Sequence, residues 1–260
     1  MKRLLLVVVV GCGGGHKPVA DVEDHVEPAT AGQEGDDTAL VPETQVERDL
    51  LGQAMHVFQS MRSTAYTHTT TIDATAGKFE FDCSGFVGYV LAQSQPRALA
   101  ELRGATKKRP LAKHFVAFFQ NLPEASAWRP IQRAADLGPG DLIAWLKPAD
   151  VVTKNTGHVM IVRARPRRDP KHPDIWVVPI IDSTAVPHGK SDSRKRTGAT
   201  GLGTGEVLLV VDDAGAPVGY RWSRGSKATL HLTTITLAGV RVGPIERDVR
   251  IERDSVRSGM

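Results

Sequence analysis

The sequence predicts an α+β protein, because a helical first half is followed by a series of strands. Apolar residues recur every three to four positions over Leu50–Met61, which is typical of an amphipathic helix. From residue 141 onward, short runs rich in branched aliphatic residues dominate, with no helical pattern between most of them. A run of strands after a run of helices favours an antiparallel sheet.

Two more helices are expected in the first half. The Thr-rich stretch 64–75 and Gly77 predict an irregular loop after the first helix. Asp82 is a residue suited to cap a helix N-terminus, and the apolar residues after it predict a buried helix. A further helix is expected over 111–121, with three phenylalanines on its apolar side.

The second half predicts six strands. Pro179 has no N–H for a ladder, so the third strand should lie locally at an edge or a bulge. The glycine-rich stretch 198–205 lacks the Lys-Ser/Thr pair of a phosphate loop and is interpreted as a tight connection. The expected strands cover residues 141–146, 157–163, 175–182, 206–211, 217–222 and 229–242.

The first residues form a secretion signal. Lys2 and Arg3 precede a short apolar run, which is too short to span a membrane, where about 20 apolar residues are needed. The residues Val-Val-Gly-Cys at 9–12 resemble a bacterial lipoprotein lipobox. The resemblance implies that a signal peptide of residues 1–11 is removed, that Cys12 is lipidated, and that the protein reaches the outer membrane.

An acidic tether is expected over residues 12–47. Residues 13–47 contain nine acidic side chains, one lysine and no aromatic residue, a composition typical of solvated, extended chain. The chain as a whole has a net charge of +4, so the domain expected over 48–260 is basic. A basic surface suits an anionic polymer such as a cell wall, and the low aromatic content disfavours single-stranded nucleic acid.

The position of Cys83 predicts a nucleophile. Directly after the expected cap Asp82, Cys83 lies in the first helical turn, where free N–H groups and the helix dipole favour a thiolate. With only two cysteines, and Cys12 assigned to lipidation, a disulfide scaffold and a multi-cysteine metal site are excluded. No metal-ligand spacing is recognised and no cofactor is expected.

Three motifs together resemble the NlpC-type cell-wall cysteine peptidases of the papain-like superfamily. They are Asp-Cys-Ser-Gly-Phe-Val at 82–87, Gly-His-Val at 157–159, and Asp182 at the end of the third expected strand. The resemblance covers about residues 48–225. It implies a papain-like fold, in which the catalytic cysteine starts a helix that packs on a small antiparallel sheet.

By this resemblance Cys83 is the nucleophile, His158 the base and Asp182 the third catalytic residue. Tyr66 lies where the family has a tyrosine implicated in binding the oxyanion, although Thr67 and His68 replace the usual glycine pair. The third position is often histidine in the family, so His188 is an alternative to Asp182.

The chain also departs from the family in length. The gap of 75 residues between Cys83 and His158 suggests an insert at about 95–135 that forms a lid or a specificity element.

The sequence thus predicts a lipid-anchored cysteine hydrolase that cleaves an amide bond in peptidoglycan stem peptides. Two alternatives stay open: a thiol acyltransferase or amidase with another substrate, and a non-catalytic wall-binding lipoprotein. His68 is a candidate to line the cleft, whereas Arg194-Lys195-Arg196 is interpreted as a solvated loop. The expected partners are peptidoglycan and, through the lipid, a membrane.

Overall fold

The computed structural model describes residues 45–106, 109–225 and 228–241. The expected signal peptide, the expected lipidation site Cys12, nearly all of the expected tether and the C-terminal tail therefore lie outside the described residues. The first helix begins at Gln45, slightly before the boundary expected at residue 48. None of the described helices is long and apolar enough to cross a membrane.

The helices are concentrated in the first half of the described chain, as the sequence predicts. The capped helix α2 and the phenylalanine-rich helix α4 form at the expected places. The bounds are α1 (Gln45–Ser60), α2 (Cys83–Ser94), α3 (Pro96–Thr106), α4 (Ala112–Gln120), a 3-10 turn (Ala134–Asp136) and the short α5 (Arg194–Thr197).

The strands form two sheets among the described residues. A small sheet has the order β1-β3-β2, and a nine-stranded sheet has the order β11-β10-β9-β8-β6-β5-β12-β4, with β7 paired to β8. The bounds are β1 (Ser63–Ala65), β2 (Thr71–Asp73), β3 (Lys78–Glu80), β4 (Trp128–Ile131), β5 (Leu142–Leu146), β6 (Gly157–Val162), β7 (Arg167–Arg168), β8 (Ile175–Thr184), β9 (Gly201–Val211), β10 (Pro217–Arg221), β11 (Leu230–Leu232) and β12 (Ile235–Val240).

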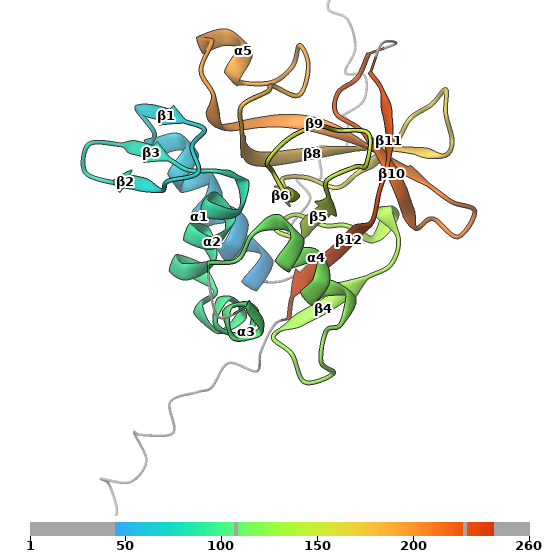
Figure 1. The fold of residues 1–260 in the computed structure, drawn as a ribbon, viewed down its shortest axis with the longest axis horizontal. Coiled ribbons are helices and arrows are strands. Elements are labelled where there is room, and N and C mark those ends of the chain that lie inside the picture. The colour runs from blue at the N-terminus through green and yellow to red at the C-terminus, as the bar shows by residue number, and fades with distance from the viewer. Residues whose placement is uncertain (1–44, 107–108, 226–227, 242–260) are drawn as a thin grey trace, which may run out of the picture. The chain divides into compact units, whose positions relative to one another are not determined.

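The α+β class with a mainly antiparallel sheet is confirmed. Among the described strands, every pairing within the large sheet is antiparallel, and β1 and β3 form the one parallel pair. The helix α4 contacts β5 and β6, and α2 contacts β6 and β8; Figure 1 shows α1, α2, α3 and α4 gathered beside the sheet.

Both faces of the central strands are buried. Leu142 and Ala144 of β5 belong to the core shared with the helices, whereas Ile143 and Trp145 belong to a second core on the opposite face. Successive side chains of a strand point to opposite faces, so this alternation is the expected one. Burial on both faces explains why these strands read as continuous apolar runs rather than as an alternating pattern.

Three strand predictions need correction. The run 229–242 is not one strand, because it divides into β11, which pairs with β10, and β12, which pairs with β5 and β4. The expected connection 198–205 instead contains the start of β9 at Gly201. The stretch 64–75, expected to be an irregular loop, contains β2 and most of β1. Pro179 lies where the pairing of β8 with β6 stops, at a local edge as predicted, and its carbonyl accepts from the Arg163 N–H.

Candidate active site

Cys83 is the first residue of α2, and the turn around it is built by Asp82. The Asp82 carboxylate accepts from the Gly85 N–H at 2.7 Å and from the Ser84 hydroxyl at 3.0 Å, which confirms the predicted cap. A Cβ at Gly85 would lie 2.9 Å from the Thr70 hydroxyl oxygen and 3.0 Å from Cβ of Phe81. The glycine of the motif is therefore required for close packing beside the thiol.

Arg109 holds the capping carboxylate from the other side. Its guanidinium makes two charge-assisted hydrogen bonds to the Asp82 oxygens, at 2.9 and 2.8 Å. Burial would raise the pKa of Asp82, but the bonds from Arg109 and Gly85 outweigh it and lower that pKa. The anionic cap is thus neutralised by a cation that also lines the space in front of Cys83.

The position of the His158 ring is set by the first residue of β6, Gly157. Gly157 precedes it with φ +147°, and a Cβ there would lie 1.9 Å from the Trp145 carbonyl oxygen. Trp145 and His158 are paired across β5 and β6, and their ring centroids are 5.7 Å apart. Only glycine fits at this first position of the strand. The glycine of the Gly-His motif is therefore required by the backbone conformation and by the close approach of β5.

His158 joins Cys83 to Asp182. Its Nε2 lies 2.6 Å from an Asp182 oxygen, and the ring also hydrogen bonds to Cys83, which leaves Nδ1 for the sulfur. Burial would lower the pKa of His158, but the charge of Cys83 and the bond to Asp182 raise it to about 10. These contacts favour the doubly protonated imidazolium form of His158.

Asp182 is a fully buried carboxylate with three partners. One oxygen binds both His158 and, at 2.9 Å, Nε2 of His188; the other accepts from Arg194 at 2.9 Å. Burial would raise the pKa of Asp182, but the charges of His188 and Arg194 and the two histidine bonds hold it well below its usual value. A buried charge of this kind requires such partners.

The two candidates for the third catalytic position are both in this cluster. Asp182 contacts His158 directly, whereas His188 reaches His158 only through Asp182. His188 is itself fixed, because its Nδ1 bonds the Trp222 carbonyl at 3.0 Å and its ring stacks on the Trp222 indole at 4.0 Å. The geometry favours Asp182 as the orienting group and gives His188 a supporting place.

Arg194 is a residue whose place the sequence analysis missed. It is 2% exposed, although the basic run around it was interpreted as a solvated loop. Its guanidinium donates to Asp182, to both oxygens of Asp192, and to the carbonyls of Asp182 and Gly201. The neighbouring Lys195 and Arg196 are exposed, so the prediction was wrong for only one residue of the three.

The glycines of β9 make room for this cluster. Gly203 is paired with Asp182, and a Cβ there would lie 2.7 Å from Nε of Arg194. A Cβ at Gly205 would lie 2.8 Å from Cβ of His188. The alternating glycines therefore let Arg194 and His188 lie flat on the sheet against the carboxylate.

His158, Asp182 and His188 offer ligand atoms within 4.8 Å of one another, a spacing that resembles a metal site. The donor set does not suit a cation, however. The nearby Arg194 guanidinium already supplies a full positive charge to Asp182. The same Asp182 oxygen is engaged by both histidines, which are held as hydrogen-bond partners.

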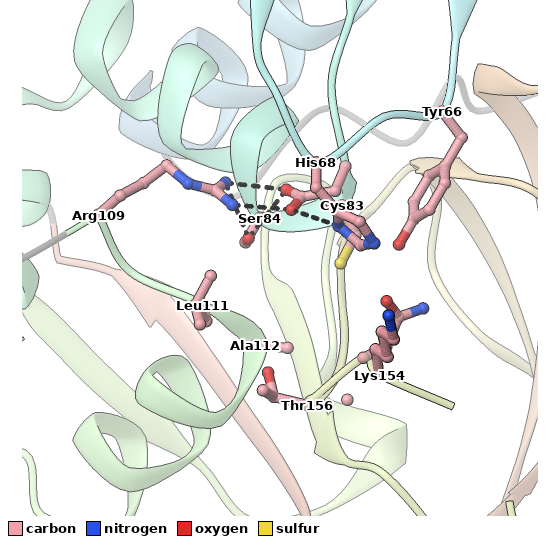
Figure 2. A pocket seen from close by; sticks show the side chains of 12 residues that line it. Tyr66, His68, Cys83, Ser84, Arg109, Leu111, Ala112, Lys154 and Thr156 are labelled. Carbon is pink, nitrogen blue, oxygen red and sulfur yellow. Dashed lines mark hydrogen bonds and ion pairs between the residues drawn. The ribbon is translucent and has the colours of Figure 1, made fainter. Parts of the chain in front are cut away.

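Two cavities meet at the pair formed by Cys83 and His158. The nucleophile pocket has a volume of about 240 Å³ and is lined by Cys83, Tyr66, Asp82 and three basic side chains, His68, Arg109 and Lys154. Figure 2 shows the Cys83 sulfur pointing into it between Arg109 and the Tyr66 ring. The second cavity, the tryptophan pocket, has a volume of about 330 Å³ and is lined by His158 and two tryptophans.

Tyr66 lies between the two pockets and lines both. Burial, followed by the negative charges of Cys83 and Asp82, raises the pKa of Tyr66, so its hydroxyl stays protonated and able to donate. In Figure 2 this hydroxyl points to the same side as the Cys83 sulfur. His68 also lines the nucleophile pocket, with Nδ1 3.4 Å from an Asp82 oxygen.

The stretch 95–135, expected as an insert, contributes one wall of the nucleophile pocket. Arg109, Leu111 and Ala112 line the cavity. The importance of Arg109 was not visible in the sequence, because nothing in the local pattern of residues 105–113 links it to Asp82. Trp222 was missed for the same reason: it meets His188 through packing between distant segments.

Comparisons with known proteins give one relative. An uncharacterized protein of Acanthamoeba polyphaga mimivirus is 30% identical to the chain over 162 residues, which cover 56% of the chain and 70% of that protein. No protein-family model matches the chain, and no solved structure matches it.

Proposed function

We propose a function from the site geometry. The chain belongs to the same family as the mimivirus protein, and the name of that protein, which is uncharacterized, indicates no activity. The proposal is a papain-like cysteine hydrolase that cleaves an amide bond in peptidoglycan stem peptides. One observation carries it: His158 is held between the buried Asp182 and Cys83, which is the first residue of a helix. A nucleophile, a base and an orienting group in contact are what amide cleavage by a thiol requires.

The chemistry follows from the contacts. The Cys83 thiolate attacks the carbonyl carbon, and the oxyanion forms beside the helix N-terminus and the Tyr66 hydroxyl, both of which supply donors. His158 then gives its proton to the leaving nitrogen, and the C–N bond breaks. Water, deprotonated by His158, cleaves the thioester and restores the thiolate. Asp182 keeps the ring oriented throughout, and no cofactor takes part.

The direct test is mass spectrometry of purified peptidoglycan after incubation with the full-length chain. We expect stem-peptide fragments from the wild type, and none from Cys83→Ala or His158→Ala when circular dichroism shows that both variants are folded. Fragments of equal yield from Cys83→Ala would contradict the mechanism. Intact muropeptides after incubation with every form, the wild type included, would contradict the proposal that peptidoglycan is the substrate.

A second candidate function is a thiol acyltransferase or an amidase with a different substrate. The tryptophan pocket favours it, because an aromatic-lined cavity beside His158 is not a feature that an anionic wall peptide requires. Product masses distinguish the two functions, since a transferase yields a new acyl conjugate. A wall-binding lipoprotein without activity would leave wall binding unchanged in Cys83→Ala.

The anchoring proposal concerns residues outside the described part of the chain. We propose that Cys12 carries the lipid, that the mature protein is attached to the periplasmic face of the outer membrane, and that peptidoglycan is its partner. Incorporation of labelled palmitate should occur in the wild type and disappear in Cys12→Ala. Label that persists in Cys12→Ala would contradict the assignment.

A further inference from the structure

The two cavities differ in chemistry, and the reacting atoms are divided between them. Cys83 lines the nucleophile pocket, whereas His158 lines the tryptophan pocket. In the proposed reaction the acyl group becomes bonded to Cys83, and the leaving group receives its proton from His158. A substrate that crosses the site therefore places its acyl part in the nucleophile pocket and its leaving group in the tryptophan pocket.

The walls of the tryptophan pocket are mainly apolar. No acidic residue is among those that line it in the described chain, and the basic Lys147 is exposed. By contrast, the nucleophile pocket has Asp82, Arg109 and Lys154 around the sulfur. The apolar side chains of the tryptophan pocket are Trp145, Pro148, Val151, Ala185, Val186 and Trp222.

The pocket is also held rigidly before any ligand binds. The Trp222 indole donates to the Val186 carbonyl at 3.1 Å and stacks on His188. The Trp145 ring stacks on Tyr220, with ring centroids 4.1 Å apart and an interplanar angle of 12°. Rigid aromatic walls lower the entropic cost of binding an apolar group.

One large apolar side chain of the rim is left in solvent. Val186 is 59% exposed although it lines the cavity, and it is among the few large apolar side chains of the described chain that are exposed. Exposed apolar surface at the mouth of a pocket is typical of a binding site. The cavity volume of about 330 Å³ is within the range of small-ligand sites.

We propose that the tryptophan pocket is the leaving-group subsite and takes an amine that bears an aliphatic or aromatic side chain. This inference rests on the amide cleavage by Cys83 and His158 in the proposed function, which sets the direction of the substrate, and it favours the second candidate, a substrate other than the wall peptide. The step is balanced: the bond from Cys83 sulfur to the carbonyl carbon forms, the C–N bond breaks, and the His158 proton moves to the nitrogen. The product amine leaves from the tryptophan pocket.

The first test is a peptide library with randomised acyl-side residues and a fixed leaving residue, incubated with the full-length chain and read by product mass. Leucine and phenylalanine as leaving residues should be cleaved roughly 10- to 200-fold faster than glycine or lysine, the range found for apolar pockets. Val186→Asp should remove most of this preference. Val218→Asp, a control at an exposed valine outside the pocket, should retain it.

Equal cleavage of all leaving residues by the wild type, or a preference unchanged in Val186→Asp, would overturn the proposal. If no library member is cleaved, calorimetry on the full-length wild type with leucinamide, phenylalaninamide and glycinamide decides. Binding of the two apolar amides alone, weakened in Val186→Asp, would uphold the pocket while the proposed hydrolase fails. Absence of binding, or equal binding of glycinamide, would overturn the pocket as well.

Discussion

The two halves of the candidate site are built in different ways. On the Cys83 side, one short segment supplies the proposed nucleophile, its cap Asp82 and the glycine that allows close packing. On the Asp182 side, a strand, a loop and a short helix bring Asp182, His188 and Arg194 together over the glycines of β9. The first half is a local motif, whereas the second is a buried tertiary network.

This difference predicts how substitutions in each half affect stability and activity. The hydrogen bonds from Ser84 and Gly85 to the Asp82 cap are made within four residues, and Arg109 adds two from a distant segment. A buried ionic network depends on every member, since loss of one partner leaves an uncompensated charge. Substitutions on the Asp182 side should therefore lower stability and activity together, whereas those on the Cys83 side should lower activity alone.

The largest effect is expected for Gly157→Ala, next to His158, the residue that joins the two halves. The added Cβ would meet the Trp145 carbonyl at 1.9 Å, and φ of +147° is strained for alanine. We expect β6 to shift and the proposed peptidoglycan hydrolysis to fall at least roughly 100-fold, the cost of a misplacement of about 1 Å.

Gly88→Ala in α2 is the matched control for this experiment. A Cβ there meets nothing within 4 Å, so activity should be unchanged and the helix slightly stabilised. Similar activities of the two variants, measured on the same peptidoglycan preparation, would show that the Gly157 backbone does not position His158.

Arg194→Met should have the next largest effect, on stability. It removes the cation from two buried carboxylates, and loss of one member of a buried ion pair costs about 3–5 kcal/mol. Lys195→Met, at the exposed neighbour, should change the free energy of unfolding by less than about 0.5 kcal/mol. Urea denaturation of both variants measures the difference.

Arg194→Lys sharpens this test. Lysine keeps the charge but lacks the planar set of donors that reaches Asp182, Asp192 and Gly201 together. We expect the free energy of unfolding of Arg194→Lys to lie between those of Arg194→Met and Lys195→Met. If Arg194→Met unfolds at the same urea concentration as the wild type, the buried network is not what holds Asp182.

Tyr66→Phe tests the Cys83 side and should change activity alone. The hydroxyl is half-buried and its pKa is raised, so it remains a donor beside the sulfur. Removing one oxyanion donor costs roughly 100-fold in kcat. Tyr89→Phe, at a partly buried tyrosine of α2, is the control. An unchanged kcat in Tyr66→Phe would exclude a role in stabilising the oxyanion.

The smallest effect is a change in titration that requires no substrate. The pKa of His158 is about 10 largely because Cys83 adds a negative charge and a hydrogen bond. In Cys83→Ala both are lost while burial still disfavours the cation, so the pKa should fall. NMR titration of labelled histidine measures it, and Cys12→Ala should titrate as the wild type does. An equal pKa with and without the thiol would disprove the ion pair.

The sequence predicted the α+β class, the capped helix at Asp82 and the positions of most strands. These are local properties, readable from periodicity and from a single capping residue. It also identified Cys83, His158 and Asp182, which the structure brings together. The division of 229–242 into two strands was missed. No change in residue type marks it, and β11 and β12 differ only in that the first pairs with β10 and the second with β5.

Arg194 could not be recognised for a related reason. Three consecutive basic residues look alike in the sequence, and only the pairing of Asp182 with Gly203 decides which of them is buried. A signal existed in the alternation Gly201, Gly203, Gly205, since glycine on one face of a strand marks a close approach. What approaches it is a question of tertiary packing.

The central claim is that His158 and Cys83 form one reactive pair, and the rate of Cys83 alkylation tests it most directly. The full-length chain would be treated with iodoacetamide at mildly acidic pH, and modification of Cys83 followed by peptide mass spectrometry. The account predicts fast modification in the wild type, and a rate at least roughly 10-fold lower in a folded His158→Ala. Equal rates in the two proteins would contradict it.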